Sequence, residues 1–416
     1  MRYLALTIIL CCTISSISAQ LTPAQYRSDV AHYSWELKSA ALNVEQAQER
    51  IAYERTSALP NLSASGRLAY NFKRVGGEHD WGSYVEPQII QTLYGGGVVR
   101  ATVEGAEVAS KIAQRDADYT LLEIEYAADY AYWNLWAMGR LHAVMERYVE
   151  LIGRESEVIE RRFQEGYVAK GDLLMIASRL SEAEYELISA EQNRVVAQHN
   201  LNILRGREMS DSVRLAGFVV VNTLMPKRLT ADEALAQRPD YAAVILAERA
   251  AKLSTRALQG AYNPQLTGGI TGSWRGVNPN ISGVSHNLNG SIYLALSIPI
   301  YHFGERRRAT AISKMSEQQS RINTSILHDT IVKEEGNAWA NLTQSYAQMI
   351  AASHSLEIAG ENLEISTYAY NEGEVSIVEL MQAQLSWMQI YTNAIYSEYN
   401  YQLACSYYRR TVGGDL

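Results

Sequence analysis

The sequence contains the same strand-to-helix junction twice, and this repeat constrains the fold more than any other feature. Thr-Leu-Tyr-Gly-Gly-Gly-Val-Val-Arg occupies residues 92–100, and Pro-Ile-Tyr-His-Phe-Gly-Glu-Arg-Arg occupies residues 299–307. Each junction joins a segment of alternating apolar and polar residues, typical of a strand, to a long segment with helical periodicity. Gly97 and Gly304 are 207 residues apart. We therefore expect two copies of one strand, turn and helix unit.

The repeat divides the 416-residue chain into ordered parts. These parts are an export signal at 1–19, a first repeat at 20–204, a connector at 205–229 and a second repeat at 230–416. In the connector, the valines at 219–221 favour a short strand. No proline lies between Pro87 and Pro226 or after Pro299. Because proline breaks helix interiors, we expect the long helices in these two intervals.

The first nineteen residues have the pattern of an export signal. Arg2 supplies a positive charge, residues 3–14 are apolar, and Ala19 fits a cleavage site. Cys11 leaves a lipoprotein signal as an alternative, although the residue before it is a leucine where a small residue is preferred. After cleavage of an ordinary signal only Cys405 remains, so we expect the exported chain to fold without disulfides.

Two hairpins are expected, at residues 62–94 and 266–301. Apolar and polar residues alternate on arms of about ten residues, which gives one apolar face and a length that crosses a bilayer at a tilt. A soluble sandwich would bury such a face, so the alternation leaves both interpretations open. In a bilayer, four strands cannot close a barrel and an open edge cannot face lipid. Several copies of the chain would then have to share one wall.

A long helix is expected after each hairpin. The first covers residues 98 to about 162, with a heptad seam that Asn134 and Glu155 interrupt. Such a seam requires a coiled-coil neighbour. At ~1.5 Å per residue, a helix of this length reaches roughly 100 Å.

A short turn is expected to reverse the chain at the end of each long helix. The turns contain Gly166 and Gly373, again 207 residues apart, and lead into return helices. Asp172 is the expected N-cap of the first return helix. Two further helices are expected at 22–57 and 230–260, the second with Thr230 as its N-cap.

The composition excludes several classes of function. A net charge of −8 argues against a nucleic-acid partner. The eight histidines lack metal-ligand spacing, no nucleophile motif is present, and Gly95–Gly97 is not followed by the Gly-Lys-Ser/Thr of a phosphate loop. We expect no metal, no cofactor and no enzymatic activity. The 27 tyrosines, against 4 phenylalanines, suit half-wet surfaces and membrane–water boundaries.

Three motifs make the sequence similar to the TolC family of outer-membrane channel proteins. Residues 296–304, Leu-Ser-Ile-Pro-Ile-Tyr-His-Phe-Gly, resemble that family's strand-to-helix junction. Residues 163–173, Phe-Gln-Glu-Gly-Tyr-Val-Ala-Lys-Gly-Asp-Leu, resemble its first tip. Residues 370–380, Tyr-Asn-Glu-Gly-Glu-Val-Ser-Ile-Val-Glu-Leu, resemble its second tip. The order of elements matches from about residue 22 to residue 410.

The resemblance implies a mixed α/β membrane protein that assembles as a homotrimer. Each chain would give four transmembrane strands to a twelve-stranded β-barrel and long antiparallel helices to a coiled-coil α-barrel. The implied function is the exit duct of a tripartite efflux or secretion system in the outer membrane of a Gram-negative bacterium. The helical part would lie in the periplasm, with a periplasmic adaptor and an inner-membrane pump as partners. The sequence does not specify whether the cargo is a drug, a metal or a protein.

The resemblance also implies a lock at the tips. In the family, a tyrosine at the second tip bridges to an aspartate at the first tip and holds the entrance shut. Tyr370 and Asp172 match these positions. The arginine that takes part in the lock is matched by Val375, which cannot form a side-chain hydrogen bond. From the residues alone, Tyr370 also continues the heptad seam and Asp172 also serves as an N-cap.

Two further sets of tip residues follow from the resemblance. Two acidic positions, three residues apart, ring the narrowest point of the family's channel, and they match Glu379 and Gln382. One carboxylate ring is therefore retained, and carboxylate rings favour cations. Gly166 and Gly373 match tip positions that contact the adaptor. Without the resemblance, Glu379 is an ordinary solvated helix residue.

One function from a different class is also compatible with the sequence. An exported coiled-coil structural or adhesive protein would contain the same long helices, with its hairpins packed as a soluble sheet. The position of the apolar face of the hairpins separates the two hypotheses, because only a membrane wall leaves that face uncovered by its own chain.

Overall fold

The fold is described from a computed structural model, which covers residues 20–414 except 71, 73–80, 217–223 and 278–286. The expected signal at 1–19 and the expected strand at 219–221 lie outside the described residues. The chain forms two compact units. Unit 1 comprises Met1–Trp35, Leu121–Leu229 and Glu335–Leu416, and unit 2 comprises Glu36–Thr120 and Thr230–Glu334. Each unit therefore contains segments of both sequence repeats.

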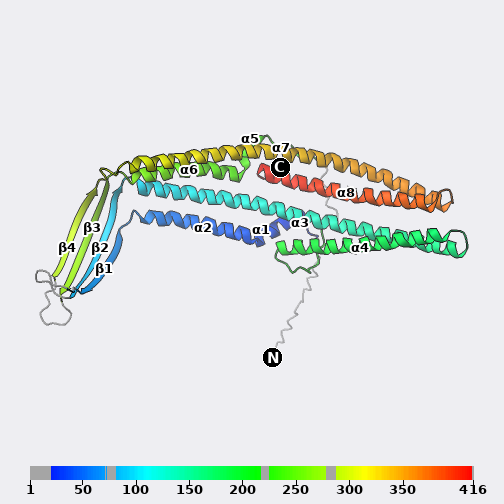
Figure 1. Cartoon of the computed structure of the whole chain (residues 1–416), viewed down its shortest axis with the longest axis horizontal. Coiled ribbons are helices and arrows are strands. Elements are labelled where there is room, and N and C mark those ends of the chain that lie inside the picture. The colour runs from blue at the N-terminus through cyan, green and yellow to red at the C-terminus, as the bar shows by residue number, and fades with distance from the viewer. Residues whose placement is uncertain (1–19, 71, 73–80, 217–223, 278–286, 415–416) are drawn as a thin grey trace, which may run out of the picture. The chain divides into compact units, whose positions relative to one another are not determined.

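The described residues form eight helices and four strands (Figure 1). The helices are α1 (Pro23–Tyr33), α2 (Trp35–Thr56), α3 (Val98–Gln164), α4 (Lys170–Leu204), α5 (Ala231–Gln237), α6 (Pro239–Gly260), α7 (Glu305–Asn371) and α8 (Ile377–Val412). The strands are β1 (Asn61–Tyr70), β2 (Trp81–Gly95), β3 (Gln265–Val277) and β4 (Asn287–Ser297). Within the described ranges, none of the helices combines the length and the apolar character that a bilayer span requires.

The two long helices have equal lengths. α3 and α7 each contain 67 residues, as the constant 207-residue interval between the repeats predicts. Each begins directly after a glycine with positive φ, +92° at Gly97 and +84° at Gly304. A left-handed backbone disfavours any side chain, so glycine is the residue that allows a strand to turn into a helix here.

Both expected hairpins are present, and they join into one sheet in unit 2. The strand order is β1-β2-β3-β4 with every neighbouring pair antiparallel. β2 of the first repeat pairs directly with β3 of the second, with a register shift between Thr92 and Tyr94. The sheet therefore combines the two repeats, which hairpin signals alone do not predict.

Two of the expected helices are broken. Residues 22–57 form α1 and α2 instead of one helix, because Ser34 adopts a non-helical backbone with ψ 124°. No proline or glycine marks this break, and unit 1 ends beside it, at Trp35. Residues 230–260 form α5 and α6, because Arg238 precedes Pro239 and is held in an extended conformation. Pro239 is tolerated as the first residue of α6. The expected N-cap Thr230 is confirmed, since its side chain accepts a hydrogen bond from the Glu233 amide.

The largest fully buried side chains of the described part of unit 1 are tyrosines. Tyr26, Tyr132, Tyr401 and Tyr408 are inaccessible to solvent, and each hydroxyl group has a backbone partner. Tyr26 donates to Leu201 O at 3.0 Å, Tyr132 to Leu21 O at 2.9 Å and Tyr401 to Leu224 O at 3.0 Å, while Tyr408 accepts from Leu229 N at 2.9 Å. Tyr26 joins α1 to α4, and the other three attach non-helical segments to the helices, so tyrosine is used here beyond the membrane–water boundaries expected from composition.

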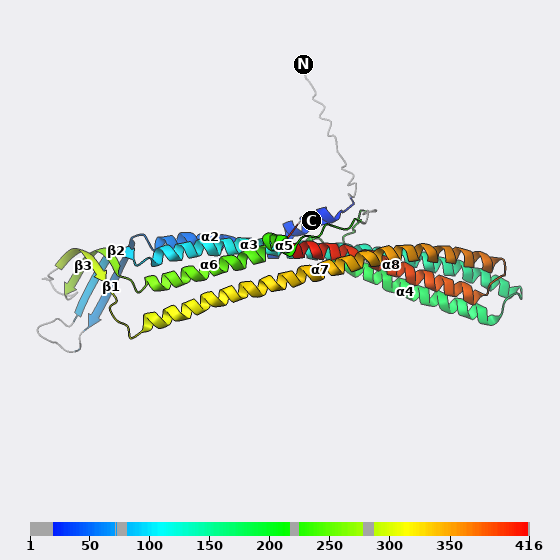
Figure 2. The ribbon, with the colours of Figure 1, turned by 90° about the horizontal axis from the view of Figure 1, so that it is seen from above.

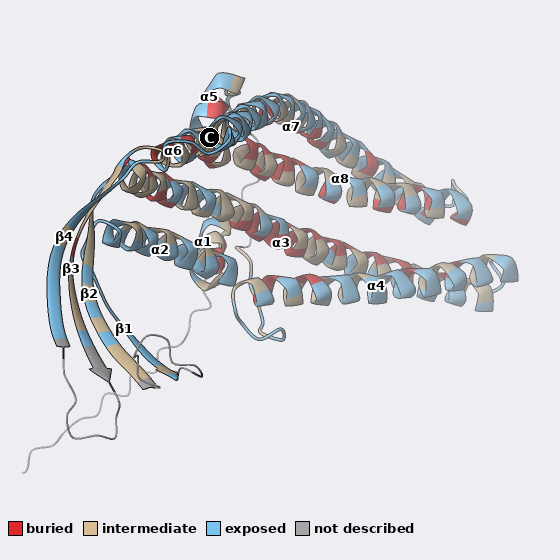
Figure 3. Ribbon diagram, turned by 60° about the vertical axis from the view of Figure 1, so that its left-hand side comes forward, coloured by how far each residue is buried: buried red, intermediate tan, exposed pale blue. Residues whose placement is uncertain are grey.

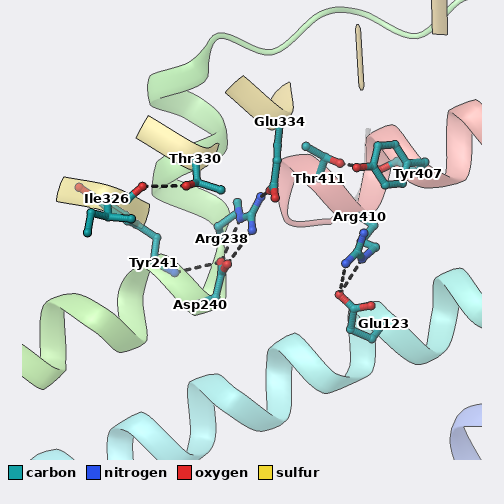
Figure 4. A network of polar contacts seen from close by, with 10 residues as sticks. All are labelled: Glu123, Arg238, Asp240, Tyr241, Ile326, Thr330, Glu334, Tyr407, Arg410 and Thr411. Atoms are coloured by element: carbon teal, nitrogen blue, oxygen red, sulfur yellow. Dashed lines mark hydrogen bonds and ion pairs between the residues drawn. The ribbon is translucent and has the colours of Figure 1, made fainter. Parts of the chain in front are cut away.

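Charged pairs fix the helices within each unit (Figure 4). In unit 1, Arg410 on α8 donates to Glu123 on α3 at 2.6 Å. In unit 2, Arg238 is 7% exposed and pairs with Asp240 at 2.6 Å and with Glu334 on α7 at 2.7 Å. A buried charge is tolerated only when it is paired, so Arg238 fixes the start of α6 against α7.

Candidate functional site

The two tip turns share one backbone conformation. Two residues after the end of α3 lies Gly166 with φ +84°, and two residues after the end of α7 lies Gly373 with φ +80°. The amide of the residue after each glycine donates to a carbonyl five residues earlier, Tyr167 to Arg162 at 2.8 Å and Glu374 to Ala369 at 2.8 Å. This is the Schellman pattern that ends a helix at a left-handed glycine. The turns lie at the same end of unit 1 (Figures 1 and 2).

The acidic residues after the turns lie one turn inside the return helices. The expectation that Asp172 is the N-cap of α4 is wrong. α4 begins at Lys170, and its N-cap is Ala169. The Asp172 carboxylate instead accepts a hydrogen bond from the Ala169 amide at 3.3 Å. Glu379 occupies the equivalent position in α8, after the N-cap Ser376. Carboxylates in a first helical turn interact favourably with the helix dipole.

Tyr370 lies in a charged cluster at the tip of unit 1. Its side chain is buried, and the Arg162 guanidinium on α3 lies 5.5 Å from its ring centroid. Burial raises the pKa of Tyr370, the charge and hydrogen bond of Arg162 oppose this rise, and the carboxylates of Glu155 and Asp172 add to it. The phenol therefore remains protonated near neutral pH and can donate a hydrogen bond. Tyr370 and Asp172 are close enough to interact electrostatically, and no direct hydrogen bond joins them among the described residues.

The arginine of this cluster is not at the position that the sequence motif indicates. Val375 is half-buried and has an apolar side chain, whereas Arg162 on α3 contacts Tyr370. Arg162 is the second of two adjacent arginines in the last turn of α3. The position of Arg162 in the helix did not indicate a contact with Tyr370, because a basic residue at a helix C-terminus is also explained by its interaction with the helix dipole.

A second polar contact joins the same two helical hairpins. Gln384 on α8 is 0% exposed, and its amide nitrogen lies 2.6 Å from both carboxylate oxygens of Glu155 on α3. The Gln384 carbonyl oxygen has no hydrogen-bond partner among the residues that the structure describes. Burial raises the pKa of Glu155, while the hydrogen bond from Gln384 and the charge of Arg154 lower it. The interruption of the heptad seam at Glu155 was the sequence signal for this contact.

The remaining predicted tip residues face solvent. Glu379 and Gln382 are exposed and lie one helical turn apart on α8. Gly166 and Gly373 are exposed at the turns, next to Tyr167, whose side chain is 78% exposed. Within the described chain none of these residues contacts Tyr370, so their roles depend on what binds or lines the tips.

The sheet in unit 2 has one apolar face. Leu62, Ile89, Ile270 and Ile292 lie directly opposite one another across the four strands. Neighbours in register share a face of a sheet, so these side chains form one apolar row. Their exposed fractions are 73%, 39%, 51% and 82%. No described residue of unit 2 covers this row, and exposed residues predominate along β1 and β4 (Figure 3).

The opposite face of the sheet is polar. Ser63, Gln88, Thr271 and Ser291 form the adjacent row, and the hydroxyl groups of Thr271 and Ser291 are 2.8 Å apart. β1 and β4 each pair with a single strand of this chain, so the sheet has two open edges among the described residues. A sheet with one apolar face, one polar face and two open edges has the properties expected of one part of a transmembrane β-barrel.

A family model and known proteins were compared with the chain. The model described as "Outer membrane efflux protein" matches residues 28–207 and 230–409. Its two matched segments correspond to the two halves of the chain on either side of the connector. The two-copy pattern seen in the sequence is thus also a property of the family.

Curated relatives and solved structures cover most of the chain. Outer membrane efflux protein BepC of Brucella suis is 22% identical over 375 residues, covering 88% of this chain and 80% of that protein. Nodulation protein T of Rhizobium leguminosarum is 24% identical, covering 84% and 77%. The Campylobacter jejuni CmeC outer membrane channel has a TM-score of 0.78 at 19% identity, covering 94% and 85%. At this identity the structural likeness concerns the fold.

Proposed function

The chain belongs to the outer membrane efflux protein family, and from this premise we propose how it is assembled, gated and partnered. It is an outer-membrane efflux channel and not an enzyme. The proposal is that three copies form one continuous duct, with a β-barrel in the outer membrane and a helical tunnel in the periplasm. The duct would receive solutes from an inner-membrane pump through a periplasmic adaptor.

The uncovered apolar row of the sheet is the observation that carries this proposal. Leu62 and Ile292 are 73% and 82% exposed in the single chain, although they are large aliphatic residues. Burying such side chains in hydrocarbon is favourable, at about 25 cal/mol per Å² of apolar surface. The soluble-sheet alternative requires this row to be covered by its own chain, and no described residue covers it.

Closure of the barrel requires other copies. The free edges of β1 and β4 would leave unpaired backbone groups in lipid, each costing several kcal/mol. Pairing β4 of one copy with β1 of the next removes both edges, and a closed ring of three copies gives twelve strands. The same symmetry would place α3, α4, α7 and α8 of each copy around one axis.

The tip cluster supports a gate. Tyr370 is buried against Arg162 and lies within electrostatic range of Asp172, so the α3–α4 hairpin and the α7–α8 hairpin are held together by polar contacts. Moving the two hairpins apart would break these contacts and widen the entrance. The exposed turns at Gly166 and Gly373, together with Tyr167, would be the surface that the adaptor contacts.

The exposed Glu379 would line the entrance and favour cations. Substituting Glu379→Gln should lower the cation-to-anion permeability ratio measured by reversal potentials in planar bilayers. Glu372→Gln, at an exposed carboxylate in the turn itself, is the matched control and should preserve the ratio. Equal selectivity of wild type and Glu379→Gln would remove Glu379 from the conduction path.

Assembly is tested on the detergent-purified protein. Native mass spectrometry should show three chains, and planar bilayers should show discrete channel openings. Substituting Ile292→Lys and Leu62→Lys on the apolar row should prevent membrane insertion, because a charge at mid-bilayer costs about 2–4 kcal/mol. Ser63→Lys on the polar face should be tolerated. A protein that remains monomeric and soluble without detergent would contradict the proposal.

A further inference from the structure

Glu155 and Gln384 form a contact between a half-buried carboxylate and a buried amide, which joins two helical hairpins. Glu155 belongs to α3 and Gln384 to α8, so the contact joins the α3–α4 hairpin to the α7–α8 hairpin near their tips. The Gln384 amide nitrogen lies 2.6 Å from both Glu155 oxygens, and the Gln384 side chain is 0% exposed. Both residues lie in unit 1, as does the nearby Tyr370.

While Glu155 is ionised, the pair has more hydrogen-bond acceptors than donors. A carboxylate only accepts hydrogen bonds, and both of its oxygens share one amide nitrogen of Gln384. The Gln384 carbonyl oxygen is buried and has no donor. A buried acceptor without a partner is unfavourable, because it has lost its water and gained nothing in return.

A proton on Glu155 supplies the donor that the Gln384 carbonyl oxygen lacks. A protonated carboxyl group carries one O–H donor and one carbonyl acceptor, which match the acceptor and donor of the glutamine amide. The two groups can then form two parallel hydrogen bonds, O–H to the amide oxygen and N–H to the carboxyl oxygen. Protonation also removes a negative charge from a half-buried position.

The charges around Glu155 do not reverse its preference for the protonated form. On α3, Arg154 favours the ionised form, but its side chain is 68% exposed and is 3.8 Å from Glu150. From α7, Tyr370 presents a neutral phenol, with Arg162 and Asp172 as its charged neighbours. Burial is the largest influence on Glu155, and it raises the pKa of this carboxyl group above its ordinary value of 4.5.

We propose that Glu155 and Gln384 form a proton-operated latch, in which binding of a proton adds a hydrogen bond between the two hairpins and stabilises the closed tip. This inference rests on the proposed gate and names how that gate is regulated. When the hairpins separate, Glu155 becomes hydrated and its proton affinity falls to the ordinary value. The closed state therefore binds the proton more tightly, so acidification favours closure and a rise in pH favours opening.

The test measures open probability of the reconstituted channel in planar bilayers between about pH 4.5 and about pH 7.5. Wild type should open more as the pH rises, by at most about tenfold per pH unit for each titrating subunit. In Glu155→Gln, an uncharged amide replaces the carboxyl group, so this channel should remain as closed at high pH as wild type is at low pH. Glu157→Gln, an exposed carboxylate on the same helix, should keep the wild-type pH dependence.

A second variant, and a measurement of stability that does not require channel opening, test the latch separately from defects in gating. Gln384→Leu removes the amide but keeps the volume, and because that amide stabilises the ionised carboxylate, the pH at which this channel opens should be higher than in wild type. In detergent, the melting temperature of wild type should gain more on acidification than that of Glu155→Gln. Channels that open but show the same pH profile in wild type and Glu155→Gln would overturn the latch. A complete absence of channel activity in all variants would instead contradict the proposed duct.

Discussion

The two repeats of this chain share a backbone but place different side chains on it. At the strand-to-helix junctions, Gly96 and its equivalent Phe303 both have positive φ, +66° and +45°. At the tips, the left-handed glycines differ by only a few degrees, +84° at Gly166 and +80° at Gly373. The path of the chain is therefore the same at both positions.

The reasons for the shared junction geometry differ between the repeats. A Cβ atom at Gly96 would overlap the carbonyl oxygen of Gly260 and approach Asn263 Cβ to 2.9 Å. Phe303 has no such restriction, since its side chain is 89% exposed and packs edge-on against Tyr301. The first repeat needs glycine for close approach, whereas the second accepts a side chain in a strained backbone conformation.

The tips differ in a way that bears on function. Tyr370 has Phe163 as its equivalent, and only the tyrosine carries a hydroxyl group that Arg162 can bind. Ser376 caps α8, whereas Ala169 at the start of α4 has no side chain that can cap. The two tips, whose glycine turns share one conformation, thus differ in a few side chains, and the proposed gate depends on this difference.

The largest expected effect is at the first junction. Gly96→Ala should destabilise the protein by about 3 kcal/mol or more, because the new methyl group meets backbone atoms that cannot move aside. Thermal unfolding of the detergent-purified protein measures this loss. Gly105→Ala is the control, since nothing lies within 4 Å of its new Cβ, and alanine favours a helix interior by up to ~1 kcal/mol. Equal stability of the two variants would contradict the close contact.

The next largest effect is at the contact between Arg162 and Tyr370. Arg162→Ala removes the contact with the Tyr370 ring and hydroxyl group, which together contribute about 1–2 kcal/mol. The open probability in planar bilayers should rise by roughly tenfold. Arg161→Ala is the neighbouring control, because Arg161 is exposed and donates only to a backbone carbonyl of its own helix. A similar rise in both variants would show that charge at the tip, and not the Tyr370 contact, matters.

A reciprocal pair of substitutions tests the capping difference. Ser376→Ala should cost about 1 kcal/mol, because the Glu379 amide loses its side-chain acceptor. Ala169→Ser should add a similar amount to the first repeat by supplying the missing cap. Hydrogen exchange of the first turns of α4 and α8 measures both changes locally. If Ala169→Ser has no protective effect, the two caps differ in backbone geometry as well as in side chain.

The smallest expected effect is at the second junction. Phe303→Gly should stabilise the chain by about 0.5 kcal/mol, since relief of the left-handed strain slightly exceeds the entropy cost of glycine. The melting temperature measures this gain. Phe303→Ala keeps the strain and is the control, so it should show no gain. A loss of stability in Phe303→Gly would mean that the ring contact with Tyr301 outweighs the strain.

Much of the fold follows from local signals in the sequence. The alternation of residues predicted both hairpins, and the proline-free intervals predicted two long helices that prove equal in length. The break at Arg238 was available from Pro239 but was overlooked, whereas the break at Ser34 has no local signal. Local patterns identify an element because they reflect backbone preferences of the residues themselves.

The candidate site was predicted only in part. Tyr370, Asp172 and Glu379 were found by resemblance to a family, while Arg162 and Gln384 were not found at all. Both missed residues act through partners more than two hundred residues away, and neither belongs to a motif. Interruption of the heptad seam marked Glu155 as unusual but did not identify its partner.

The sequence by itself determined the repeat, the amphipathic strands, the turn glycines and the lengths of the long helices, because each depends on residues that are near one another in the chain. The tertiary structure alone decided that β2 pairs with β3, that the apolar face stays uncovered, and that Arg162 and Gln384 meet Tyr370 and Glu155. These outcomes depend on which distant surfaces are brought together. Such pairing is a property of the packed chain and is not encoded in the periodicity of any one segment.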